Sequence, residues 1–206
     1  MVLCGEFDSL LSKCELNATK IIKIIGIINL FPNFVTLIVE TNTLTYMKDL
    51  TITAIIKVYQ YDELNEGDRS LIKTAMEATA RSYSPYSHFS VGAAALLGNG
   101  TVVTGTNQEN AAYPSGLCAE RTTLFYANSQ YPDQSVVTLA IAARTEKDFI
   151  DHPIPPCGAC RQVILETEKR YKQPIRILLY GKECIYEVKS IGDLLPLSFD
   201  ASAMED

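Results

Sequence analysis

The sequence contains no tryptophan, only two histidines and no run of basic residues. Proteins that bind nucleic acid usually carry a basic patch for the phosphates, whereas this chain has a formal net charge of −6. That balance argues against a nucleic acid partner. The remaining composition, 47% apolar and 20% charged, is ordinary for a folded protein, so the expected ligand is a compact, uncharged or cationic small molecule.

A long uninterrupted apolar segment is also missing. The most apolar part, residues 21–39, is broken by Lys23, Asn29, Pro32 and Asn33. A membrane-spanning helix needs about 20 consecutive, mainly apolar residues. We therefore expect no membrane anchor.

The start of the chain lacks the basic residues of a secretory signal peptide and has acidic residues instead. We therefore expect a cytoplasmic protein in a reducing compartment. Six cysteines in such a compartment favour metal or redox chemistry over disulfides. Three of them, Cys4, Cys14 and Cys184, have no partner in any motif and are interpreted as inert thiols.

The 206 residues suit one domain with an appendage. Residues 1–62 contain no recognisable site and are interpreted as an extension of unknown role. They either pack against the rest or do not belong to the working protein. Residues 63–206 form the expected functional domain.

Helix and strand patterns alternate within residues 63–206, and an Asn-Gly turn at residues 98–100 indicates a hairpin. This order predicts an α/β fold with a mixed sheet covered by helices. The expected helices are residues 65–82, 117–128 and 157–170, and the expected strands are residues 89–95, 101–104, 136–143, 175–180 and 184–188.

Cys118, Cys157 and Cys160 form the candidate metal centre. Each lies at the start of a predicted helix, where the helix dipole favours a thiolate, and the spacing of the last two puts both sulfurs on one face. No fourth protein ligand is evident, which is typical of a catalytic zinc site with a position for water. His152 is close enough in sequence to be considered, although an ordinary surface role fits it better. A C-x-x-C pair alone would also fit a disulfide or a structural zinc site.

Glu120 follows Cys118 by two residues, which places a carboxylate beside the metal as a candidate proton carrier. Arg121 and Arg161 each flank a predicted ligand, three residues after Cys118 and directly after Cys160. A hydrogen bond from either guanidinium to a sulfur would withdraw charge and restore the Lewis acidity of the metal. The alternative for each arginine is a surface ion pair.

The pattern C-x-E followed by P-C-x-x-C matches that of zinc-dependent base deaminases. Over residues 64–199 the chain resembles the small homotetrameric cytidine deaminases. The resemblance implies a three-layer α/β/α fold, one Zn²⁺ per subunit, and deamination of cytidine and deoxycytidine in pyrimidine salvage. The shared motifs are residues 86–94, 107–114 and 194–199, in addition to the two cysteine segments.

The resemblance also implies roles for residues around the substrate. Asn107 and Glu109 would hold a ribose hydroxyl, which an amide and a carboxylate can do together, although both can also stabilise a turn. Phe89 would stack on the pyrimidine, although a core position in a strand fits it as well. The backbone N–H of Ala119 would donate to the base carbonyl.

Two aromatic residues are implied at subunit boundaries. Phe199 resembles the aromatic residue that enters a neighbouring subunit's site, and Tyr113 lies in a segment near such a boundary. The chain departs from the family at Pro155, where relatives have Ser or Thr, and at Gln108, where they have an apolar residue. The carbonyl of Pro155 can still accept from the 4-amino group.

Three other functions fit parts of the sequence. The zinc segments also occur in deaminases of nucleic acid and of nucleoside-like antibiotics. The acidic charge opposes the first, and the ribose motif opposes both. A structural zinc module without activity is the third, and the incomplete ligand set opposes it. An extension that obstructs assembly would make the chain inactive.

Overall fold

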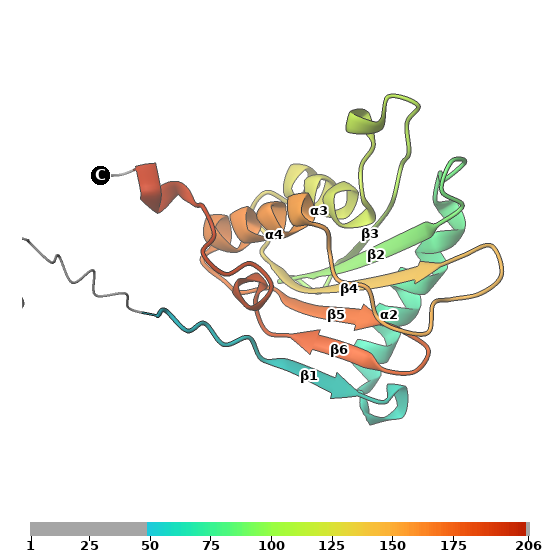
Figure 1. Cartoon of the computed structure of the whole chain (residues 1–206), viewed down its shortest axis with the longest axis horizontal. Coiled ribbons are helices and arrows are strands. Elements are labelled where there is room, and N and C mark those ends of the chain that lie inside the picture. Colours follow the sequence, from blue (N-terminus) through green and yellow to red (C-terminus); the bar gives the residue numbers. More distant parts are fainter. Residues whose placement is uncertain (1–48, 205–206) are drawn as a thin grey trace, which may run out of the picture. The chain divides into compact units, whose positions relative to one another are not determined.

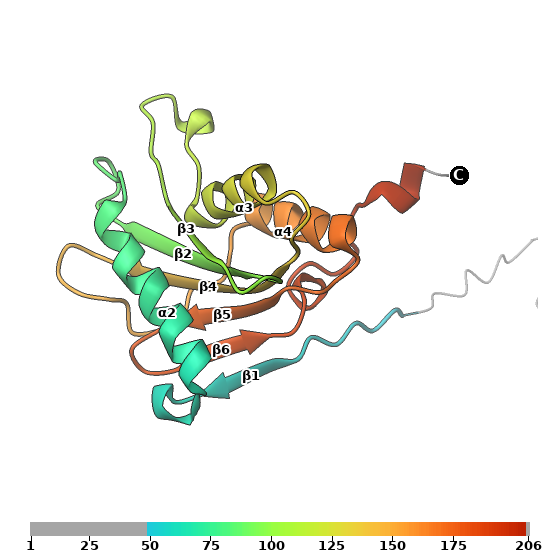
Figure 2. The ribbon, with the colours of Figure 1, turned by 180° about the vertical axis from the view of Figure 1, so that it is seen from behind.

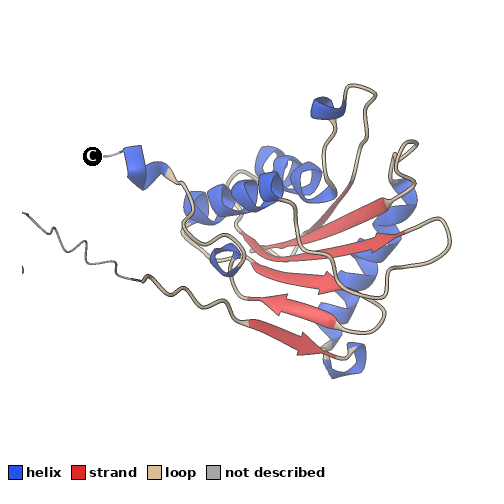
Figure 3. Cartoon of the chain, in the orientation of Figure 1, coloured by secondary structure: helices blue, strands red, loops and turns tan. Residues whose placement is uncertain are grey.

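A computed structural model describes residues 49–204 of the chain. Six strands form one sheet with the order β1-β6-β5-β4-β2-β3, and three helices pack on it (Figures 1 and 3). The strands are β1 (Ile56–Tyr59), β2 (Ser90–Leu97), β3 (Val102–Thr106), β4 (Val136–Arg144), β5 (Arg176–Tyr180) and β6 (Ile185–Val188). The helices are α2 (Glu66–Ala78), α3 (Ala119–Gln130) and α4 (Gly158–Tyr171).

The sheet is mixed, because β4 and β5 are parallel while the other neighbouring strands are antiparallel. Helix α2 covers one face, and α3 and α4 lie side by side on the other (Figures 1 and 2). Two separate apolar clusters correspond to the two faces, one containing α2 residues and the other α3 and α4 residues. The predicted α/β fold with a helix-covered mixed sheet is confirmed.

Strand β2 contributes side chains to the apolar clusters on both faces of the sheet. Ala93, Ala95 and Leu97 belong to the cluster under α3 and α4, whereas Ala94 belongs to the cluster under α2. This alternation follows from the two-residue period of a strand. The small side chains let both helix layers approach the sheet closely.

Gly105 of β3 brings α3 still closer. A Cβ atom at this position would lie 2.5 Å from Thr123 Oγ1 and 2.6 Å from Thr123 N, so a larger residue would push the helix away. The close approach matters for the site because Cys118 is the N-cap of α3. A hydrogen bond of 3.4 Å from Asn128 Nδ2 to Thr167 Oγ1 joins α3 to α4, whose N-cap is Cys157.

Strand β1 was not expected from the sequence. It lies before residue 63 and pairs with β6 from Ile56 opposite Val188 to Tyr59 opposite Ile185. The sheet thus includes four residues assigned to the extension, and the division at residue 62 stays a prediction. Residues 1–48, with Cys4, Cys14 and the apolar segment 21–39, lie outside the described residues. Within residues 49–204, every helix is too short or too polar to cross a membrane.

Candidate active site

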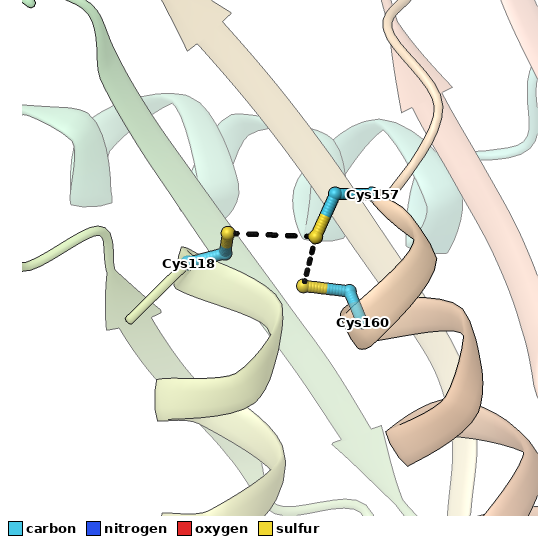
Figure 4. A group of neighbouring side chains, drawn as sticks. All are labelled: Cys118, Cys157 and Cys160. Atoms are coloured by element: carbon cyan, nitrogen blue, oxygen red, sulfur yellow. Dashed lines mark hydrogen bonds between the residues drawn. The ribbon is translucent and has the colours of Figure 1, made fainter. Parts of the chain in front are cut away.

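The three predicted metal ligands converge between the first turns of α3 and α4 (Figure 4). The Sγ atom of Cys157 lies 3.7 Å from that of Cys118 and 3.4 Å from that of Cys160, and all three sulfurs lie within 4.8 Å of one another. Cys160 is buried, Cys118 is half-buried and Cys157 is exposed. The cluster is therefore open on one side.

The spacing of the sulfurs fits a tetrahedral zinc ion. Sulfur ligands at about 2.3 Å from zinc lie about 3.8 Å from one another in that geometry. Within residues 49–204, these three cysteines are the group of potential metal ligands whose ligand atoms lie this close together. The predicted alternative ligand His152 lies at the surface, with its Nδ1 3.2 Å from Glu183 Oε2. Three ligands and an open side leave room for water or substrate.

The charge state of the cluster also favours a cation. The pKa of the Cys118 thiol is lowered to about 5, chiefly because the Cys160 and Cys157 thiols hydrogen-bond to its thiolate and Arg121 lies beside it. The pKa of Cys160 is raised, because its thiol is held by Cys118 and is buried. Ionisation of Cys118 therefore disfavours ionisation of Cys160. A divalent cation among the sulfurs would remove that opposition, so the residues fit a zinc ion.

Glu120, the predicted proton carrier, lies in the first turn of α3 with a relative exposure of 5%. Burial raises the pKa of its carboxyl group, and the Cys118 thiolate adds to the effect. A carboxyl with a raised pKa both takes up and releases a proton near neutral pH more readily than an ordinary glutamate. Such an environment is typical of a general acid and base.

The two arginines differ from each other. Arg121 lies beside the Cys118 sulfur, and its Nη2 donates to the Gly116 carbonyl over 3.3 Å. Arg161 was expected to reach a ligand sulfur. The structure instead shows its Nε donating to the Pro156 carbonyl at 2.8 Å and its Nη1 donating to the Leu194 carbonyl at 2.6 Å.

A cavity of about 510 Å³ opens beside the cysteines, a size that suits a small molecule. Its lining includes Cys118, Arg121 and the predicted ribose residues Asn107 and Glu109. Tyr113 also lines it, 76% exposed and with its ring edge-on to Tyr86. The structure thus places residues from motifs far apart in sequence around one cavity.

Three predicted substrate residues are not among the residues that line this cavity. Phe89 lines a separate cavity of about 460 Å³, together with Phe149 and Ile154. Ala119 is fully buried at the start of α3, and Phe199 is 62% exposed near the C-terminal end. Within one copy of the chain, these residues do not form a single pocket with Asn107 and Glu109.

Asn107 and Glu109 also hold the loop before β2. Asn107 Oδ1 accepts from the Val91 N–H at 2.8 Å, and its Nδ2 donates to the Phe89 carbonyl at 2.9 Å. Glu109 Oε2 accepts from the N–H groups of Tyr86 at 2.9 Å and Ser87 at 3.3 Å, and the Ser87 hydroxyl together with these N–H groups lowers the pKa of the Glu109 carboxyl group.

Sequence reasoning missed the partner of Asn107 on the far side of this loop. Ser82 donates its hydroxyl to Asn107 Oδ1 although the two residues are 25 positions apart. Its hydroxyl also lies 3.3 Å from that of Ser84. No local pattern relates a serine after a helix to an asparagine after a later strand, so only the fold shows the pair.

Comparisons with known proteins agree with this site. The family described as "Cytidine and deoxycytidylate deaminase zinc-binding region" matches residues 65–173. The cytidine deaminase of Halalkalibacterium halodurans is 41% identical over 136 residues, which cover 66% of this chain and 96% of that protein. The cytidine deaminase of Mycobacterium tuberculosis is 36% identical over 135 residues, which cover 64% of this chain and 86% of that protein.

Solved structures show the same likeness. The crystal structure of cytidine deaminase from Burkholderia pseudomallei is 38% identical with a TM-score of 0.55, covering 66% of this chain and all of that one. The crystal structure of cytidine deaminase from Mycobacterium tuberculosis is 34% identical in sequence with a TM-score of 0.52, and the match covers 66% of this chain and 99% of that one.

Proposed function

This chain belongs to the cytidine and deoxycytidylate deaminase family, and on that premise we propose that it hydrolyses cytidine and deoxycytidine. The reaction adds one water molecule at C4 of the pyrimidine and releases the 4-amino group as ammonia, so the products are uridine and deoxyuridine. The observation that carries the proposal is the buried Glu120 carboxyl beside three clustered cysteine sulfurs.

Cys118, Cys157 and Cys160 would hold one zinc ion per subunit. When bound, zinc acts as a Lewis acid that makes water nucleophilic near neutral pH. Three thiolates weaken that effect by donating charge to the metal. Arg121 offsets the loss because its guanidinium lies beside the Cys118 sulfur.

Glu120 would carry the protons. It takes a proton from the attacking water, passes it to N3 of the base, and helps to protonate the departing amine. The pKa of its carboxyl group is raised by burial, which suits a group that both accepts and donates. One carboxyl group thus serves several steps.

Asn107 and Glu109 in the cavity, together with Ala119 and Phe89 outside its lining, would hold the nucleoside. Asn107 and Glu109 hydrogen-bond a ribose hydroxyl while also fixing the loop before β2. The backbone N–H of Ala119 donates to the base carbonyl, and Phe89 stacks on the pyrimidine. Pro155 is an exposed residue two positions before Cys157, and its carbonyl accepts from the 4-amino group.

We also propose a homotetramer that acts in pyrimidine salvage in the cytoplasm. Tyr113 and Phe199 support the oligomer, since both are large aromatic residues exposed in one copy of the chain. In the assembly they would contribute to a neighbouring subunit's substrate site. The net charge of −6 supports a nucleoside over a nucleic acid substrate.

The purified full chain tests the function directly. We expect it to convert cytidine to uridine, measured by the loss of the cytosine absorbance band, and a zinc chelator to stop the conversion. A cytosine-containing oligonucleotide should not be converted. Conversion of the oligonucleotide alone, or of neither substrate by a zinc-loaded protein, would contradict the proposal.

A further inference from the structure

The segment of residues 194–200 is attached to α4 at three points, and the segment runs alongside that helix (Figures 1 and 2). Arg161 Nη1 donates to the Leu194 carbonyl at 2.6 Å, and Gln162 Nε2 donates to the Phe199 carbonyl at 2.8 Å. The third contact is an ion pair of 2.7 Å between Lys169 Nζ and Asp200 Oδ2. All three donors belong to one helix.

Two of the three contacts go to main-chain carbonyls and one goes to the Asp200 carboxylate, so the attachment uses neither of two apolar side chains in the segment. Leu197 is 83% exposed and Phe199 is 62% exposed. Leu197 also has a φ of 54°, a left-handed conformation that is unfavourable for a residue with a branched side chain. Such a conformation persists where surrounding contacts fix it, and here the contacts at Leu194 and Phe199 lie on either side of it.

The ion pair at Asp200 is well placed to persist over a broad pH range. The pKa of Asp200 is lowered to about 2 by Lys169 and by the hydroxyl and N–H groups of Ser202. The Asp200 side chain is 14% exposed, whereas that of Lys169 is 57% exposed. Because solvent screens the charge of the exposed lysine, the ion pair contributes little alone and stabilises the segment together with the two carbonyl contacts.

Arg161 links this segment to the metal-binding turn. Its Nε donates to the Pro156 carbonyl, one residue before Cys157, while its Nη1 donates to Leu194. Arg161 itself directly follows Cys160. One guanidinium group therefore fixes both the start of the ligand turn and the start of the C-terminal segment.

We propose that Arg161, Gln162 and Lys169 are positioning residues that fix residues 194–200 on α4 and so set where Phe199 projects. The inference rests on the proposed function, which gives Phe199 a contact at a substrate site. It adds that α4 carries both a metal ligand and the support for this aromatic residue. Loss of the support is expected to weaken substrate binding more than turnover.

A charge swap in the full chain tests the proposal. Lys169→Asp should raise hydrogen–deuterium exchange of residues 195–204 by about fivefold, the upper range for an exposed ion pair. The KM for cytidine should rise by a similar factor, with kcat less affected. The double variant Lys169→Asp/Asp200→Lys should restore both values.

Two further variants keep the test decisive. Arg170→Asp makes the same charge change one position later on α4, where the guanidinium lies over the Tyr171 ring, and should change neither exchange nor KM. Gln162→Ala removes the contact to the Phe199 carbonyl without a charge change, and it should raise both the hydrogen–deuterium exchange and the KM.

The outcomes separate the two proposals. Exchange and KM that stay unchanged in Lys169→Asp and in Gln162→Ala would overturn the positioning role, as would failure of the double variant to restore them. A wild-type chain that binds zinc but does not convert cytidine would instead remove the proposed function. Exchange of residues 195–204 would still report on their attachment to α4.

Discussion

Two buried glutamates, at the start of α3 and near the end of α4, have opposite surroundings. Glu168 is 8% exposed, and its Oε1 accepts from the N–H groups of Ile175 and Ile191 at 2.8 and 3.0 Å. Its Oε2 accepts from the Ser190 hydroxyl at 2.9 Å. Glu120 is 5% exposed, and its own N–H and the Cys160 thiol hydrogen-bond its carboxyl group without offsetting the effect of burial. Burial instead raises its pKa.

The difference shows that burial alone does not assign a role to a carboxylate. Glu168 accepts hydrogen bonds that join α4 to the chain before β5 and after β6, which makes it structural. Glu120 lacks that stabilisation and lies beside the cysteine sulfurs, which makes it reactive. Isosteric and truncating substitutions should therefore affect the two residues differently, acting on turnover at Glu120 and on stability at Glu168.

The largest expected effect is that of Glu120→Gln on turnover. The amide keeps the shape of the side chain but cannot carry the proton, so kcat should fall by about 10² to 10⁴. Steady-state kinetics with cytidine would measure the loss, and metal analysis should show zinc retained. A variant with wild-type kcat would remove Glu120 from the mechanism.

Truncation of Glu168 should act on stability and not on chemistry. Glu168→Ala leaves the buried N–H groups of Ile175 and Ile191 without acceptors, which should lower the free energy of unfolding by about 2–4 kcal/mol. Denaturant titration would measure it, and kcat per folded molecule should be unchanged.

The matched control is Glu168→Gln. Both N–H groups donate to a single oxygen, Oε1, which the amide retains, and the Ser190 hydroxyl can reverse its hydrogen bond to accept from the new NH₂ group. The change should therefore be much milder than Glu168→Ala. Equal losses in the two variants would mean that the charge of Glu168, and not its hydrogen bonds, stabilises this region.

A smaller effect is expected from Arg121, which lies beside the Cys118 sulfur. Arg121→Gln removes the positive charge that lowers the pKa of this thiol, so zinc affinity should fall by about tenfold. Competition with a metal chelator would measure the change. Arg161→Gln is the comparison, because its hydrogen bonds go to carbonyl groups, and a larger loss of zinc affinity there would reverse the assignment of the two arginines.

The smallest effect concerns pH and the stability of the metal-free protein. The folded pKa of Glu120 is raised, so its contribution to stability is fully present below the unfolded value of about 4.3 and is lost as pH rises through the folded pKa. Glu120→Gln should abolish this part of the pH dependence. Urea titrations of both proteins between acidic and neutral pH would test it, and identical profiles would contradict the raised pKa.

The sequence predicted the sheet, its helices and the cysteine cluster, because strand alternation and the first turn of a helix are local patterns. Strand β1 escaped prediction since three of its four residues are exposed and no buried face marks it. The contacts of Arg161 were not predictable, because Leu194 lies 33 positions away. Phe89 lines a cavity apart from Asn107, which alternation along a strand does not reveal.

Titration of zinc into the metal-free chain, with the rate of cytidine conversion as the readout, tests the whole site most directly. We predict no conversion without metal and a rate that rises to a plateau at one zinc per chain, while Cys157→Ala neither binds the ion tightly nor gains activity. Full conversion by the metal-free chain, or a normal plateau in Cys157→Ala, would contradict a zinc site built from the three cysteines.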